Sequence, residues 1–216
     1  MFKFLYDISG FNRSLTADMP IEKTAKIEKG QIVKISLGKV VNASPGSYLG
    51  VANETHTGKH DPFNPRSNGE FINVIISPRA IYSTKPPVLE FMMEGLSETT
   101  ALSPTFPSYN NTDFIGGYLI LLSKGNTSTN KDNIGSVREI TDFVKNTLTL
   151  TLTAGGKIGV GDKYAFLPPI GFKKLEMDTA CANIRLTDTT TAEFTVTGHD
   201  LKNGELHVMC RNNLLS

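Results

Sequence analysis

Apolar and polar side chains alternate with a period of two along much of the chain, which is the spacing of side chains on one face of a β-strand. The clearest example is residues 147–153, where three leucines alternate with threonines. This pattern predicts antiparallel strands that bury one face and expose the other to water. Shorter alternations recur at Val33, Ile35 and Leu37, at Phe194 and Val196, and at Leu206, Val208 and Cys210.

Two apolar runs, residues 71–76 and 118–122, are continuous and bounded by turn residues, which predicts strands buried on both faces. Only residues 88–96 and 140–145 could be helical, and neither segment is long or well capped. The predicted fold class is therefore all-β, with two barrel-like or sandwich-like modules of short antiparallel strands and little helix.

The dipeptide Asn203-Gly204 is the strongest turn signal in the chain. Both central residues of a type I′ turn need positive φ, which Asn and Gly tolerate best, so the dipeptide predicts such a turn. It would join a strand near Leu201 to a terminal strand over residues 205–211.

Residues 83–111 differ in composition from the rest of the chain, because they contain four prolines among serine, threonine and asparagine. We place a module boundary there. Two polar insertions, residues 53–69 and 124–135, are longer than hairpins need and predict loops that project, make contacts or are flexible. The predicted organisation is an N-terminal arm, an N-terminal β module, a Pro-rich linker and a C-terminal β module, at residues 1–20, 21–85, 86–113 and 114–216.

The charge balance bears on the kind of partner and not on the fold. In 216 residues, 22 Lys and Arg face 21 Asp and Glu, a formal net charge of +1. This balance argues against nucleic acid or an anionic membrane as the main partner and favours a protein. No apolar run approaches the roughly 18 residues of a membrane span, and residues 1–10 are too polar for a secretory signal, so we expect a soluble protein made in a cytoplasm.

Candidate chemistry is sparse. His56 and His60 have the i, i+4 spacing of a helical zinc site, but Gly58 and nearby prolines favour a solvated loop. The glycine-rich residues 155–161 link two expected strands without a following helix, so they do not predict a phosphate-binding loop. Cys210 continues the alternation of its strand and is expected to be a small core residue. We therefore predict no enzymatic activity, no metal and no cofactor.

Surface for protein contacts remains. Residues 1–20 are dense in aromatic side chains, of which Phe2, Phe4, Tyr6 and Phe11 are candidate partner contacts. They form either an edge strand of the fold or an arm that pairs with a neighbouring molecule. The loop at residues 53–69 is a second candidate contact, through Phe63 and Arg66.

Residues 29–34 (KGQIVK), 38–43 (GKVVNA) and 48–52 (YLGVA) resemble a pattern in small structural proteins of tailed bacteriophages, including head decoration proteins. Residues 161–169 and 196–201 are similar in texture to phage virion β domains. The resemblance implies a virion protein on the capsid exterior that binds the major capsid protein and stabilises contacts between its subunits. It also implies self-association, as a trimer or dimer, and multivalent binding.

Three other functions fit the same sequence. A tail or head-fibre subunit shares the β architecture and differs in where it docks. A displayed carbohydrate-binding or adhesive module needs exposed aromatic platforms, for which Phe63, Tyr82 and Tyr109 are the candidates. A hydrolase on a β scaffold needs an acid, base or nucleophile set, and none can be named from the sequence.

Overall fold

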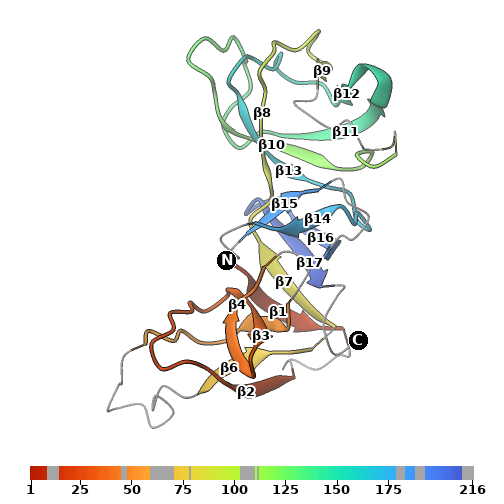
Figure 1. Cartoon of the computed structure of the whole chain (residues 1–216). Helices are drawn as coiled ribbons and strands as arrows, with labels where there is room; N and C mark the ends of the chain where they lie inside the picture. Colours follow the sequence, from red (N-terminus) through yellow and green to blue (C-terminus); the bar gives the residue numbers. More distant parts are fainter. Residues whose placement is uncertain are drawn as a thin grey trace.

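The computed structural model has the all-β architecture that the sequence predicts (Figure 1). It describes residues 1–8, 15–44, 48–58, 71–77, 79–102, 110, 112–178, 183–187 and 193–210. These residues form three antiparallel sheets, and their one helical element is the 3₁₀ turn Lys145–Thr147.

The N-terminal sheet curls into a half-barrel with a core of its own. Its strand order is β2-β6-β5-β3-β4, and Ile21, just after β2, forms a parallel bridge with Val40 of β4. Val33, Val40 and Val74 are among the side chains buried inside the curl. The strands are β2 (Thr16–Pro20), β3 (Ile32–Ser36), β4 (Lys39–Asn42), β5 (Gly50–Ala52) and β6 (Phe71–Ile75).

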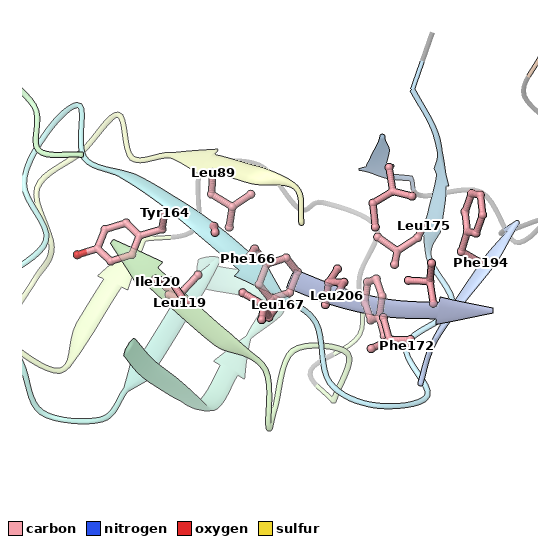
Figure 2. Close-up of a cluster of buried hydrophobic side chains, with 14 of the residues drawn as sticks. Leu89, Leu119, Ile120, Tyr164, Phe166, Leu167, Phe172, Leu175, Phe194 and Leu206 are labelled. Atoms are coloured by element: carbon pink, nitrogen blue, oxygen red, sulfur yellow. The ribbon is translucent and has the colours of Figure 1, made fainter. Parts of the chain in front are cut away.

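The other two sheets share one larger core. The central sheet has the order β1-β7-β17-β16-β14-β15, and the third sheet has the order β8-β13-β10-β11-β12-β9. Figure 2 shows the row of side chains that joins them, from Tyr164 and Phe166 through Leu206 to Phe194. The central strands are β1 (Lys3–Asp7), β7 (Ala80–Thr84), β14 (Leu175–Met177), β15 (Ile184–Leu186), β16 (Phe194–Asp200) and β17 (Glu205–Cys210). Those of the third sheet are β8 (Val88–Glu90), β9 (Thr100–Leu102), β10 (Tyr118–Ser123), β11 (Val137–Val144), β12 (Thr149–Leu152) and β13 (Lys163–Leu167).

The sheets divide the chain differently from the predicted modules. β7, from the first half of the sequence, lies between β1 and β17, so the central sheet contains both ends of the chain. The expected linker, residues 86–113, contains the edge strands β8 and β9. Pro86 and Pro87 are tolerated there because they lie at and before the start of an edge strand, where a missing N–H breaks no inner ladder.

The alternating apolar patterns of β12 and β17 are confirmed in position. Leu150, Leu152, Val208 and Cys210 are all buried. The two segments that could have been helical are instead β8 with its following loop and the end of β11. In β11 the register shifts between Ile140 and Asp142, and this bulge brings the apolar residues 140 and 143 to the same face, a spacing that imitates a helix.

The predicted turn type was placed at the wrong hairpin. Asp200 pairs with Glu205, so β16 and β17 are joined by four residues, among which Gly204 alone has positive φ. The Asp200 carboxylate accepts a hydrogen bond from the Asn203 backbone N–H at 3.0 Å and fixes this wider loop. Two consecutive positive φ values, 49° and 77°, occur instead at Leu37 and Gly38 between β3 and β4.

Leu37 offers a stabilising substitution. Its side chain is 100% exposed, so it contributes no packing, and its backbone has a conformation that costs a leucine about 1 kcal/mol relative to Asn. We expect Leu37→Asn to raise the free energy of unfolding by about 0.5 to 1 kcal/mol in urea denaturation. Leu148, also at positive φ but packed against the core, is the matched control, and its replacement by Asn should destabilise. A loss of stability in Leu37→Asn would contradict the strain argument.

Candidate interaction surface

Two of the predicted contact residues of the N-terminus, Phe4 and Tyr6, lie in β1, an edge strand of the central sheet. β1 pairs with β7, with an irregularity in the register between Phe4 and Tyr6. Phe2 is 3% exposed and stacks on Phe194 with ring centroids 5.3 Å apart, so it is a core residue of this chain and not a contact for a partner. Phe4 is half-buried against Tyr82. Tyr6, at 46% exposure, remains available, while Phe11, Phe63 and Arg66 lie outside the described residues.

A groove of about 500 Å³ lies where the β16–β17 hairpin meets the outer face of the third sheet. We call it the junction groove. Four of its aliphatic side chains, from four separate segments, are 38% to 68% exposed: Val88, Leu122, Ile134 and Leu201. The remaining lining residues are Lys85, Pro86, Ile120, Leu121, Gly135, Ala165, Lys202, Asn203, Gly204 and Glu205.

The register of the third sheet builds the floor of this groove. Val88 pairs with Ala165, Ala165 with Ile120, and Ile120 with Val137. Directly paired residues share a face, so these four aliphatic side chains form one row across four strands. Leu119 and Leu121 of β10 have their side chains on the other face of the sheet, and both are buried. Ala165 and Ile120 in the middle of the row are buried too, so the exposed apolar surface of the row lies at its ends, at Val88 and Val137.

The β16–β17 hairpin forms one wall. Gly204 lies over the floor, since a Cβ at that position would be 3.7 Å from Ile120 Cδ1. Lys85 and Lys202 are exposed and stand at this end of the groove, and neither forms an ion pair with another described residue. Glu205 also lines this end, and its carboxylate accepts a hydrogen bond from the Ser83 hydroxyl.

The polar loop at residues 124–135 forms the opposite wall and is held in place from inside. Its Asn130 side chain donates to Asp162 Oδ2 at 2.8 Å and to Tyr164 Oη at 2.7 Å. Asp162 also accepts the backbone N–H groups of Gly125 and Gly159, each at 2.9 Å. The loop packs so closely on residues 155–161 that a side chain at Gly125 would overlap a backbone carbonyl. This insertion is therefore a packed loop that presents Ile134, the most exposed of the four aliphatic side chains.

The electrostatics of that anchor are those of a structural carboxylate. Burial by itself would raise the pKa of Asp162, but the hydrogen bonds from Asn130, Gly159, Gly125 and Ser128 outweigh it and lower the pKa below the usual 3.8. Burial raises the pKa of Tyr164 to about 12, so the phenol stays protonated. Both groups keep one charge state near neutral pH, as a rigid hydrogen-bonded anchor requires.

Arg138 supports the same region from β11. Its guanidinium is buried and donates to the carbonyl oxygens of Thr153, Gly156 and Glu98, at 2.8 Å for Gly156. Its Nη1 lies 3.9 Å from Oδ2 of Asp132 in the 124–135 loop. The arginine thus ties the loop to the connecting segments that follow β8 and β12.

The other side chains singled out in the sequence have structural partners. His56 Nδ1 lies 2.7 Å from the Ala25 carbonyl oxygen. Tyr82 is buried in the large core, so it cannot serve as a platform for sugars; Tyr109 lies outside the described residues. In the described part of the chain, no group of three or more His, Cys, Asp or Glu could hold a metal ion. The same part contains no helix long and apolar enough to cross a membrane.

Comparisons with protein-family models, with curated proteins and with solved structures found no match to the chain.

Proposed function

We propose that this chain is a structural protein of a bacteriophage virion that binds the capsid exterior and stabilises contacts between major capsid protein subunits. The observation that carries the proposal is the junction groove, where four aliphatic side chains from separate segments of the chain gather and are 38% to 68% exposed. Such a patch, rimmed by charged residues, is typical of a protein-binding site.

The choice of a virion rests on the resemblance at residues 31–52. That segment folds as β3, a tight turn, β4 and then β5, which agrees with the strand, turn and strand order of the resembling pattern. Weak groove contacts would be enough for stable attachment if each copy is held at several points, because such a copy dissociates only when all its contacts break together.

Co-sedimentation with empty shells of the major capsid protein from the same genome tests the proposal. We expect the wild-type protein to pellet with shells, and the double substitution Ile134→Asp and Leu201→Asp to weaken binding about tenfold or more. Leu37→Asp is the matched control, because it places the same charge at a fully exposed leucine far from the groove. Absence of the wild-type protein from the shell pellet would refute the capsid role, and pelleting with isolated tails instead would assign it to the tail.

A further inference from the structure

The strand that borders the junction groove lies at the edge of its sheet. Within the described part of the chain, β8 ends the third sheet and pairs with β13 alone. Phe166 N–H donates to the Pro87 carbonyl at 2.8 Å, and Phe91 N–H donates to the Asp162 carbonyl at 2.9 Å. Because backbone groups alternate sides along an antiparallel strand, those of Val88 and Glu90 point away from β13, toward solvent.

The side chain of Val88 ties this edge to the groove. It is the first member of the row that continues through Ala165 and Ile120. A strand added beside β8 would place every second side chain next to Val88, on the face that also exposes Leu122. An aliphatic residue of that strand placed next to Val88 would extend the row and cover the exposed Val88 side chain from water.

The charges at the groove fix the direction of such a strand. Lys85 lies just before β8, and Lys202 lies in the hairpin wall at the same end. Glu205 is the one carboxylate among the groove residues and is engaged with Ser83. A segment running antiparallel to β8 ends beside these lysines, so acidic residues are favoured at its C-terminal end.

We propose that the junction groove binds an extended segment of its partner protein that adds to the edge of β8, alternates aliphatic side chains, and carries carboxylates at its C-terminal end. This inference rests on the proposed function, since it names the chemistry of the partner at the same site. Pro86 and Pro87 limit the added pairing to a few residues, which suits a short recognition segment.

Two blocked octapeptides of identical composition test the proposal. One alternates valine with threonine and ends in two aspartates, and the other begins with the two aspartates. We expect the first to shift the methyl signals of Val88, Leu122, Ile134 and Leu201 in ¹³C spectra and to bind about threefold to tenfold more tightly than the second. It should also slow hydrogen exchange at the Val88 and Glu90 amides, which a peptide lying across the groove without pairing would not do.

The double substitution Lys85→Glu and Lys202→Glu is the charge control. Both side chains are exposed, so the fold should persist, and the preference between the two peptides should disappear or reverse. Equal affinity of the wild-type protein for both peptides, or unchanged methyl and amide signals with either, would overturn the inference. If the protein binds shells but not the peptide, this inference is wrong and the proposed function stands. If it binds the peptide but not shells, the proposed capsid function is wrong and the groove still binds an extended segment.

Discussion

Replacing Asp162 by Ala is expected to lower the free energy of unfolding by about 3 to 5 kcal/mol. The carboxylate is buried and accepts hydrogen bonds from Asn130 and from the backbone of Gly125 and Gly159. Its removal leaves these donors without an acceptor in a closely packed region that admits no replacement side chain. Urea denaturation of the two proteins at neutral pH measures the difference.

The pH dependence of this difference identifies the carboxylate as its cause. The folded-state pKa of Asp162 is lowered, so its contribution is complete above the unfolded value of about 3.8 and is lost as pH falls through the folded pKa. The gap in stability between wild type and Asp162→Ala should therefore be constant from pH 7 to about 5 and narrow below about pH 4. A gap that persists unchanged at lower pH would mean that lost packing, rather than the charge, explains the effect.

Asp200 supplies the comparison. Its pKa is also lowered by hydrogen bonds from Asn203, but Asp200, at the end of β16, is only partly buried. We expect Asp200→Ala to destabilise far less, because water replaces the lost acceptor. A similar loss in both variants would show that the local turn, and not burial, determines the importance of such carboxylates.

The anchor also bears on the groove. Asp162 holds Asn130, and the same loop presents Ile134 to the junction groove. The position of Ile134 in the groove therefore depends on the hydrogen bonds of Asn130, four residues earlier in the same loop. Because the network is internal, a partner-binding surface made of a long polar insertion can be rigid before it binds, which lowers the entropy cost of association.

Strand positions were predictable from the sequence because burial in a sheet follows a period of two. Leu150, Leu152 and Val208 face the core as their alternation predicts. The prediction failed where the backbone departs from that period. Leu37 continues an alternation but occupies a turn, and the bulge after Ile140 shifts the phase of β11. The turn at Leu37 has a local signal in the adjacent Gly38, whereas the bulge in β11 has none, since it is imposed by pairing with β12.

The candidate site was not predictable as a site, although one of its signals was in the sequence. The continuous apolar run at residues 118–122 predicted a strand buried on both faces, and this holds for Leu119, Ile120 and Leu121. Leu122 at the end of the run is 44% exposed and lines the junction groove. The rest of the groove comes from β8, the 124–135 loop and the β16–β17 hairpin, and β8 and the hairpin are distant from residues 118–122 in sequence. Which segments meet there depends on the central sheet containing both ends of the chain, and no local pattern encodes that pairing.

The internal anchors were hidden for a different reason. Asp162 and Arg138 looked like single scattered charges, and single charges are ordinarily solvated. The glycines at residues 155–161 were the available clue, because a backbone without side chains permits another loop to approach closely. Read together with the Asn- and Ser-rich residues 124–135, they indicate two loops packed on each other, with polar side chains satisfying the backbone between them.

Replacing Arg138 by Met should also lower the free energy of unfolding by about 3 to 5 kcal/mol, because here buried acceptors lose their donor. The methionine fills much of the volume but donates no hydrogen bond, so the carbonyl oxygens of Thr153, Gly156 and Glu98 lose their donor. Asp132 then loses its cation, and its Oδ2 has no hydrogen-bond partner to compensate. Urea denaturation again measures the loss.

Arg138→Lys and Arg185→Met separate charge from geometry in this second prediction. Lysine keeps the charge, yet one ammonium cannot reach three carbonyl groups that the planar guanidinium spans, so Arg138→Lys should remain clearly destabilised. Arg185 forms an exposed ion pair with Glu176 at 2.8 Å, and its replacement by Met should cost less than about 1 kcal/mol. If Arg138→Lys proved as stable as wild type, the buried charge alone would hold the loops. If Arg138→Met cost no more than Arg185→Met, the guanidinium would be dispensable and the loop wall of the groove would owe its position to Asp162.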